Sequence, residues 1–136
     1  MKIMLDKGAI MPTRAHPYDA GMDLYSMEDK FVPGECGAAF NTGVHLEIPK
    51  GFVGLVKSRS GLMVKQHITT DGTIDSGYTG AIKVKLFNHS LMSHRVKKGD
   101  KIAQLVIVPC LLPELELVDS LEETDRGDNG FGSTGR

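Results

Sequence analysis

Short stretches in which apolar and polar residues alternate with a period of two constrain the fold of this chain more than any other feature. The alternation runs through residues 44–48, 82–86 and 114–117. A period of two places successive side chains on opposite faces of a strand, so it predicts strands with one buried face. Residues 52–56 and 102–108 are nearly continuous apolar runs rich in β-branched side chains, which predicts strands covered on both faces.

Turn-forming residues separate these stretches, and glycine alone supplies 16 of the 136 residues. Only residues 60–67 have the pattern of a short helix, which Gly61 weakens. Many short strands with frequent turns predict an all-β barrel or sandwich. The length suits one domain, so we expect a single β domain over residues 1–125 and a flexible, glycine-rich tail over residues 126–136.

Composition and charge exclude several classes of protein. The formal net charge of −1 argues against a nucleic-acid partner. The longest apolar stretch is too short and too interrupted to span a membrane, and charges near the N-terminus come too early for a secretory signal. Two cysteines, Cys36 and Cys110, are too few for a disulfide scaffold. We interpret them as reduced thiols of a cytoplasmic protein, with a single bridge as the alternative.

Common catalytic signatures are missing from the sequence. It contains no phosphate loop ending in Gly-Lys, no Gly-x-Ser-x-Gly elbow, no His-Glu-x-x-His helix and no Cys-x-x-Cys pair. The five histidines and two cysteines have no familiar ligand spacing, so no structural zinc site is predicted.

The segment from Gly72 to Gly80 combines turn residues with two chemically useful side chains. Asp75 is placed at a bend, where a carboxylate can be aimed and partly shielded from water, as a general base requires. Tyr78 follows three residues later in a chain with few aromatic residues. The alternative is an ordinary hairpin, because turns use Asp, Ser and Gly in any case.

Two further segments are suited to an anion. Arg59 supplies charge, Ser60 a hydroxyl and Gly61 close backbone approach, although a helix start with a solvated arginine is the alternative. The tail combines glycines with Arg126 and two hydroxyl residues, and its lone aromatic residue suggests stacking on a base. A disordered end is the alternative there. The whole set suits a phosphorylated ligand with an aromatic part, and a nucleotide is the economical choice.

Two more residues stand out less clearly. Gln104 is a lone amide within an apolar run, and a buried amide must find partners in the core or on a ligand. Asp23 lies in a strand-like stretch where a surface carboxylate is the ordinary interpretation.

In order along the chain, these segments resemble the five motifs of the homotrimeric dUTPase family, the dUTP nucleotidohydrolases. The matching segments are Ala20-Gly21-Met22-Asp23-Leu24, Arg59-Ser60-Gly61-Leu62, Gly72 to Gly80, Lys98 to Leu105 and Arg126 to Gly135. Each motif alone is of modest specificity, but five in the expected order are very specific.

The resemblance implies a jelly-roll-like β fold, the dUTPase β-clip, in a homotrimer with shared active sites. It implies hydrolysis of dUTP to dUMP and pyrophosphate, which limits uracil in DNA and supplies dUMP for dTMP synthesis. Asp75 would deprotonate the water that attacks the α-phosphorus. Mg²⁺ would be held through the substrate phosphates, with no direct protein ligand and with Asp23 approaching it at most through water.

The resemblance also implies which residues contact the substrate. The phosphates would be held by Arg59, Ser60, Gly61, Gln104, Arg126, Gly132, Ser133 and Thr134. The uracil edge would be bound by the hairpin from Thr69 to Lys83, which includes Thr73 and Ile74. Tyr78 would pack under the deoxyribose, and Phe131 would cover the uracil when the tail closes.

A few positions depart from the family pattern, and other functions remain as alternatives. Ser58 stands where the family often has proline, Thr69 where many bacterial members have asparagine, and Asn129 where glycine is common in the tail. A dCTP deaminase shares the fold but would need a glutamate at the position of Lys85. The same fold would also serve a non-catalytic nucleotide sensor or a structural jelly roll.

Overall fold

The computed structural model describes residues 1–128, and the chain in this range is almost entirely β-structure. One short helix, α1 (Ser60–Gln66), follows the sixth strand. The strands are β1 (Lys2–Leu5), β2 (Met22–Tyr25), β3 (Lys30–Val32), β4 (Gly37–Asn41), β5 (Val44–Glu47), β6 (Phe52–Lys57), β7 (Ile68–Thr69), β8 (Asp71–Ile74), β9 (Lys83–Asn88), β10 (His94–Val96) and β11 (Lys101–Pro109). The all-β prediction is confirmed.

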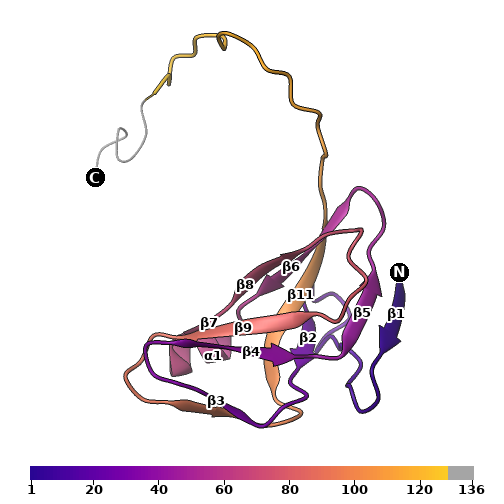
Figure 1. Cartoon of the computed structure of the whole chain (residues 1–136), viewed down its shortest axis with the longest axis vertical. Coiled ribbons are helices and arrows are strands. Elements are labelled where there is room, and N and C mark those ends of the chain that lie inside the picture. Colours follow the sequence, from indigo (N-terminus) through magenta and orange to yellow (C-terminus); the bar gives the residue numbers. More distant parts are fainter. Residues whose placement is uncertain (129–136) are drawn as a thin grey trace.

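The strands form four antiparallel sheets within the described residues. The largest has the order β2-β11-β6-β8, a second has the order β4-β9-β7, and the pairs β1-β5 and β10-β3 complete the body. The adjacent strands β4 and β9 are seen in Figure 1. Since β11 lies between β2 and β6, it brings together segments that are far apart in the sequence.

One apolar core joins the two larger sheets. On β9 the burial alternates strictly, so that Val84 and Leu86 face inward. From the other sheet, Leu24, Ile102 and Leu105 join the same cluster. Buried apolar area of this kind is the main stabilising contribution to a domain of this size.

The sequence predictions for individual strands have different outcomes. Residues 44–48 and 82–86 form β5 and β9, and residues 60–67 contain the predicted helix. Residues 52–56 and 102–108 lie in β6 and β11, but buried residues alternate there with half-buried ones, so the prediction that both faces are covered is wrong for the single chain.

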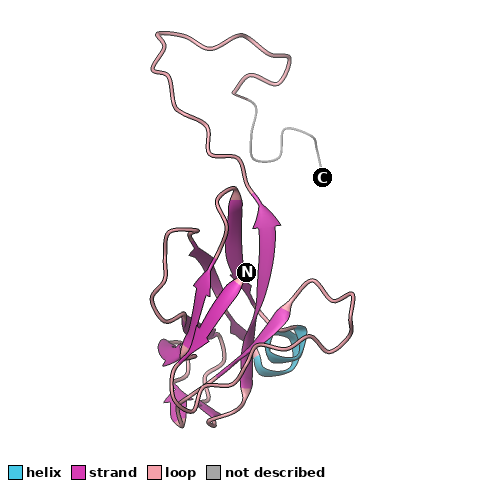
Figure 2. Cartoon of the chain, turned by 90° about the vertical axis from the view of Figure 1, so that its right-hand side faces the viewer, coloured by secondary structure: helices cyan, strands magenta, loops and turns pink. Residues whose placement is uncertain are grey.

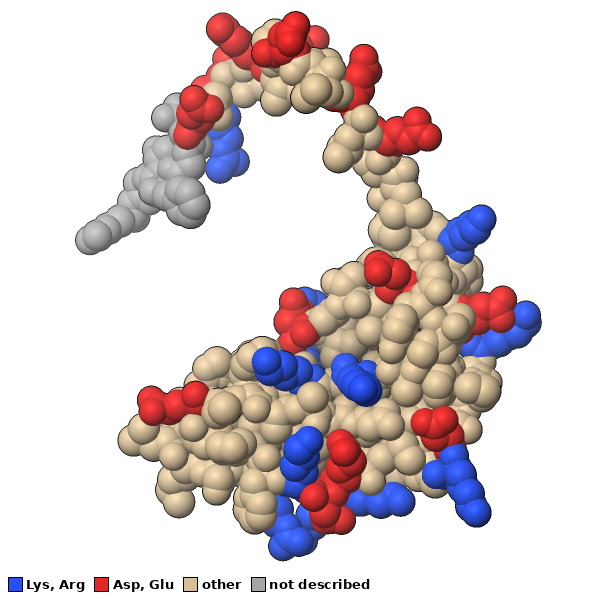
Figure 3. Space-filling model, in the orientation of Figure 1, with Lys and Arg blue, Asp and Glu red and all other residues tan. Residues whose placement is uncertain are grey.

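Residues 114–117 were expected to form a strand, and this prediction is also wrong for the single chain. No helix or strand lies between residues 110 and 128, where the chain runs away from the body (Figures 1 and 2). Leu115 and Leu117 are almost completely exposed. The alternation is present, but no strand of the same chain lies alongside to pair with it. Acidic side chains follow this segment, as Figure 3 shows.

Two smaller predictions concern thiols and membranes. Both Cys36 and Cys110 are free, as expected. Among the described residues, no helix has the length and apolar character that crossing a membrane requires.

Candidate active site

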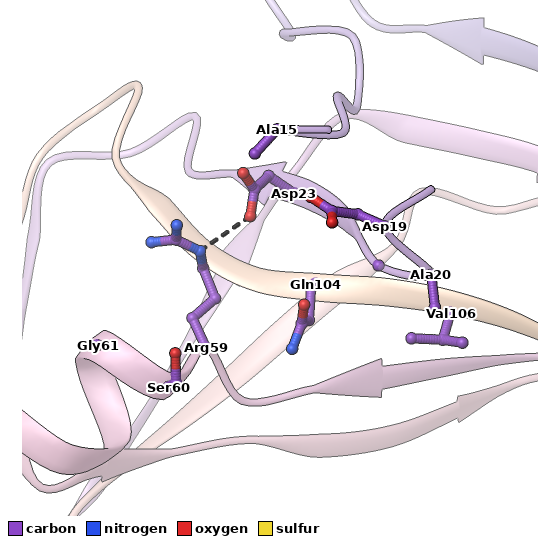
Figure 4. A pocket seen from close by; sticks show the side chains of 10 residues that line it. Ala15, Asp19, Ala20, Asp23, Arg59, Ser60, Gly61, Gln104 and Val106 are labelled. Atoms are coloured by element: carbon purple, nitrogen blue, oxygen red, sulfur yellow. Dashed lines mark hydrogen bonds and ion pairs between the residues drawn. The ribbon is translucent and has the colours of Figure 1, made fainter. Parts of the chain in front are cut away.

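A pocket of about 590 Å³ gathers three of the segments selected from the sequence (Figure 4). Asp23 comes from β2, Gln104 from β11, and Arg59 with Ser60 from the junction between β6 and α1. The sheet order explains this convergence, because Gln104 lies opposite Asp23 on one side and Lys57 on the other. Five residues selected from the sequence, Asp23, Arg59, Ser60, Gly61 and Gln104, therefore line one pocket.

Asp23 is held between two cations at the floor of this pocket. Its Oδ1 accepts a hydrogen bond from Arg59 Nε at 2.9 Å, and its Oδ2 lies 2.8 Å from Lys101 Nζ. The hydrogen bond to Asp23 is the main reason why the pKa of Lys101 is raised. Arg59 is held to the carboxylate by Nε, and its Nη1 donates a long hydrogen bond of 3.5 Å to the Lys101 carbonyl, while the terminal nitrogens point away from Asp23 (Figure 4).

Gln104 has a defined place because its neighbour is a glycine. Its Nε2 donates a hydrogen bond to the Ser58 carbonyl at 3.1 Å. A Cβ atom added at Gly21 would lie 3.0 Å from Gln104 Cδ and closer still to Oε1. Gly21 therefore leaves the room that the Gln104 carboxamide occupies at the pocket.

The junction that carries Arg59 is secured by Ser58, where the family often has proline. Ser58 Oγ accepts from the Thr70 N–H at 2.8 Å and donates to the Thr70 carbonyl at 2.9 Å. These two bonds tie the end of β6 to the start of β8. Helix α1 then begins at Ser60 and ends at Gln66, and His67 caps it with a left-handed φ of 55°.

The candidate base lies in a different pocket, of about 280 Å³, together with Thr73, Ile74, Tyr78 and Lys83. Asp75 itself is exposed in the single chain, so residues 1–128 of its own chain do not supply the shielding expected of a general base. A turn orders the segment that follows: the Tyr78 N–H donates to the Asp75 carbonyl at 3.0 Å, and the Tyr78 hydroxyl donates to the Ala81 carbonyl at 3.0 Å.

The two pockets lie at opposite ends of the paired strands β6 and β8. Ile74 is opposite Gly54, whereas Asp71 is opposite Lys57. Asp75 follows β8 beyond one end of this pair, and Arg59 follows β6 beyond the other end. At ~3.3 Å per residue the two positions are roughly 15–20 Å apart. Within one chain the candidate base and the candidate phosphate ligand therefore do not reach the same atom.

The structure says less about the remaining predicted site residues. Thr69 lines neither pocket, and its hydroxyl is hydrogen bonded to His89 Nε2 at 2.7 Å. Arg126 is exposed beyond the body. The predictions for Asn129, Phe131, Gly132, Ser133 and Thr134 lie outside the described residues. Lys101 was missed as a site residue, because a lysine beside a strand end gives no local signal.

The described residues contain no group of three or more His, Cys, Asp or Glu side chains that could hold a metal ion. Asp23, the carboxylate expected to approach Mg²⁺ through water, already has both oxygens engaged by cations. The donor set between residues 1 and 128 of the single chain does not fit a directly coordinated metal.

Fold and pocket together define a class, that of antiparallel β proteins which present an arginine, a hydroxyl and a carboxamide to an anionic ligand. A family model described as dUTPase matches residues 7–135. The chain belongs to the dUTPase family.

Individual relatives agree with this assignment. The deoxyuridine 5'-triphosphate nucleotidohydrolase of Clostridium acetobutylicum is 45% identical over 134 residues, which cover 96% of this chain and 92% of that protein. The Arabidopsis thaliana protein of the same name is 45% identical over 132 residues, covering 96% of this chain and 80% of that protein.

Solved structures give the same result. The Staphylococcus bacteriophage 80alpha dUTPase with dUPNHPP has a TM-score of 0.92 and 36% identity, covering 99% of this chain and 98% of that one. A mutant dUTPase from phage phi11 of S. aureus, with a TM-score of 0.83 and 33% identity over 90% of this chain and 98% of that one, reveals the coordination of a structural Mg(II) ion. These neighbours confirm the jelly-roll-like β fold.

Proposed function

We propose that this chain hydrolyses dUTP to dUMP and pyrophosphate in the cytoplasm, and that it thereby limits uracil in DNA and supplies dUMP. Asp75 orients and deprotonates the water that attacks the α-phosphorus. Attack in line with the leaving pyrophosphate depends on positioning and charge neutralisation more than on covalent chemistry. Family membership and relatives named for this activity support the proposal.

The observation that carries the mechanism is the separation of Asp75 from Arg59. They lie beyond opposite ends of the β6–β8 pair, so neither pocket alone holds both the base and the phosphate ligand. A second copy of the chain must bring its Asp75 to the Arg59 pocket of the first. A closed ring of three copies forms three such sites, and this is the homotrimer that we propose.

The exposed apolar side chains of the C-terminal segment support self-association. Leu111, Leu115, Leu117 and Leu121 are each at least 85% exposed. So many exposed leucines in one segment are typical of a surface that another protein covers. We assign that role to the neighbouring copies.

On the phosphate side, Arg59, Ser60, Gly61 and Gln104 bind the triphosphate chain. Asp23 holds Nε of Arg59 and Nη1 makes a long bond to the Lys101 carbonyl, so Nη2 is the nitrogen that we assign first to the phosphates. Mg²⁺ bound to the phosphates supplies further charge neutralisation. In the tail, we assign Arg126, Gly132, Ser133 and Thr134 to the phosphates and Phe131 to the uracil face.

On the nucleoside side, the pocket beside Asp75 binds the sugar and the base. Tyr78 packs against the deoxyribose and leaves no room for a 2′-hydroxyl. Thr73, Ile74 and Lys83 line the same pocket, where backbone groups pair with the uracil edge. Such a site rejects a mismatched base strongly, because its own polar groups would be left unpaired. Thr69 is a more distant contributor, since its hydroxyl is engaged by His89.

Deamination of dCTP is disfavoured by a specific contact. Lys85 stands where a deaminase would need a carboxylate, and its Nζ lies over the Phe87 ring, 4.9 Å from the centroid. A non-catalytic sensor would bind dUTP but not release pyrophosphate, which the same assay detects.

Pyrophosphate release is the direct test. We expect the chain to turn over dUTP, but not dCTP, dTTP or UTP, with Mg²⁺ and not with EDTA. The Asp75→Asn variant should lose activity but still bind dUTP. Ammonia release from dCTP would overturn the proposal, as would unchanged turnover in the variant.

Mixing variants tests the shared site. Asp75→Asn and Arg59→Gln chains are each expected to be inactive alone. Unfolded together and refolded, they should recover activity in about a quarter of the sites, because some neighbours then combine an intact Asp75 with an intact Arg59. Absence of recovery, with trimers formed, would show that each chain builds its own site.

A further inference from the structure

His45 connects two segments that are distant in the sequence. It lies on β5, and its Nδ1 is 2.8 Å from the carbonyl oxygen of Thr79, in the turn that carries Tyr78. Its Nε2 is 3.2 Å from Asp6 Oδ1, just after β1. The imidazole is only 17% exposed. One side chain therefore bridges the N-terminal segment and the turn that follows Asp75.

Both partners of the ring are hydrogen-bond acceptors. A carbonyl oxygen and an ionised carboxylate have no proton to offer, so each ring nitrogen must donate. Neutral imidazole carries one N–H, whereas imidazolium carries two. The geometry is therefore complete only when His45 is protonated. In agreement, the pKa of His45 is raised above its ordinary 6.5, chiefly by the hydrogen bond to Thr79 and further by Asp6, against the opposing effect of burial.

Few other charges face this ring. On the N-terminal side, Asp6 is in contact, and Lys2 lines the same pocket but is paired with Glu47 at 3.0 Å. Glu47 lies on β5 two residues beyond His45. From the turn, only the neutral Thr79 carbonyl reaches the ring, since Asp75 and Lys83 line the separate candidate nucleoside pocket.

The Thr79 carbonyl lies between the groups that orient Tyr78. The Tyr78 hydroxyl donates to the Ala81 carbonyl, and the ring lies against Gly80, where an added Cβ would be 2.6 Å from the hydroxyl oxygen. The ring orientation thus depends on the backbone path from Tyr78 to Ala81. The hydrogen bond from His45 to the Thr79 carbonyl, in the middle of that path, holds the backbone of the turn against β5.

We propose that protonated His45 is a positioning residue that holds the turn bearing Tyr78 in place. A group whose pKa is raised on folding stabilises the fold fully below its unfolded pKa, and this contribution is lost as the pH rises through the folded pKa. The turn is therefore held most strongly at mildly acidic pH, and this stabilisation is lost as the pH rises. Only the kinetic consequence rests on the proposed function.

An NMR titration of the full chain tests the protonation directly. The His45 ring signal, identified by its absence in His45→Gln, should titrate with a midpoint above 6.5. The amide nitrogen of Gly80, which is bonded to the Thr79 carbonyl carbon, should shift with the same midpoint. Asp6→Asn should lower that midpoint. The matched control is Glu47→Gln, a nearby carboxylate that makes no bond to the ring, and it should leave the midpoint in place.

A midpoint at or below 6.5, a Gly80 signal that does not follow it, or equal effects of the two carboxylate variants would overturn the proposal. These readouts need no substrate, so they remain valid even if the chain does not hydrolyse dUTP. If His45→Gln fails to fold, the Asp6→Asn comparison still decides.

Kinetics provide the second readout. At about pH 6 the KM for dUTP of His45→Gln should exceed that of the wild type about fivefold, the usual effect of one hydrogen bond. By about pH 9 the two KM values should be nearly equal. The kcat should change little, because Asp75 is untouched. Since the terminal phosphate of dUTP titrates for both proteins, the ratio of the two KM values isolates His45. A ratio that does not vary with pH would contradict the proposal.

Discussion

Replacing Asp23 by asparagine removes one charge from the candidate phosphate pocket and keeps the shape of the side chain. In the wild type, the carboxylate accepts from Arg59 Nε at 2.9 Å and lies 2.8 Å from Lys101 Nζ. Asparagine can still accept one of these bonds. It cannot compensate two cations, so Arg59 and Lys101 are left to repel each other across an uncharged amide.

The exposure of the partners sets the expected magnitude. Removing one member of a fully buried ion pair costs ~3–5 kcal/mol. The side chains of Arg59 and Lys101 are 33% and 39% exposed, so water can solvate them after the change. We therefore expect the free energy of unfolding to fall by roughly 1–2 kcal/mol.

The effect on activity is expected to be larger than the effect on stability. Arg59 would lose the contact that aims its terminal nitrogens, and misplacement of a phosphate ligand by about 1 Å can cost ~100-fold in rate. We expect kcat/KM for dUTP to fall by about 10-fold to 100-fold, measured by pyrophosphate release. The melting temperature is measured in parallel at a fixed protein concentration, because the stability of an oligomer depends on concentration.

Asp71→Asn is the matched control. Asp71 lies in the same sheet and forms an ion pair with Lys57, but its side chain is 74% exposed. Removal of such a surface pair costs at most ~1 kcal/mol, and we expect kcat/KM to be unchanged. The reasoning would be refuted if Asp23→Asn kept kcat/KM within about threefold of the wild type, or if the control lost as much.

Two other substitutions follow from local packing. Gly21→Ala should lower kcat/KM for dUTP about 10-fold while leaving the chain folded, because the new methyl group displaces the Gln104 carboxamide. If the variant kept the kinetics of the wild type, the carboxamide would have adapted to the methyl group. The Thr70 hydroxyl is buried without a hydrogen-bond partner among the described residues, so Thr70→Val should raise the free energy of unfolding by about 1 kcal/mol. Chemical denaturation measures this change, and a loss of stability would mean that the hydroxyl has a partner.

Local patterns in the sequence predicted four of the eleven strands that the structure describes, namely β5, β6, β9 and β11. The alternation in residues 82–86 predicted β9, and its inward residues Val84 and Leu86 are buried. The types of residue in the candidate site were also predictable, because Arg59, Ser60 and Gln104 suit an anion whatever their neighbours are. The five ordered motifs led to the family that the comparisons confirm.

Other features of the site were not predictable from the same patterns. Nothing local links Asp23 to Arg59, which is 36 residues away, or to Lys101, which is on another strand. The same limit applies to His45, whose two partners lie before β2 and after β8. Residues 114–117 alternate like a strand but pair with no strand between residues 1 and 128.

The sequence by itself determined several of the strands, the inward face of β9, and which residues have the chemistry to bind a nucleotide. These properties are local, since the period of the side chains and the nature of each group depend only on near neighbours. Only the tertiary structure decided that Asp23 holds Arg59, and that Asp75 lies beyond the far end of the β6–β8 pair. Strand order and register arise from contacts between distant segments, and a local pattern does not encode which strands will meet.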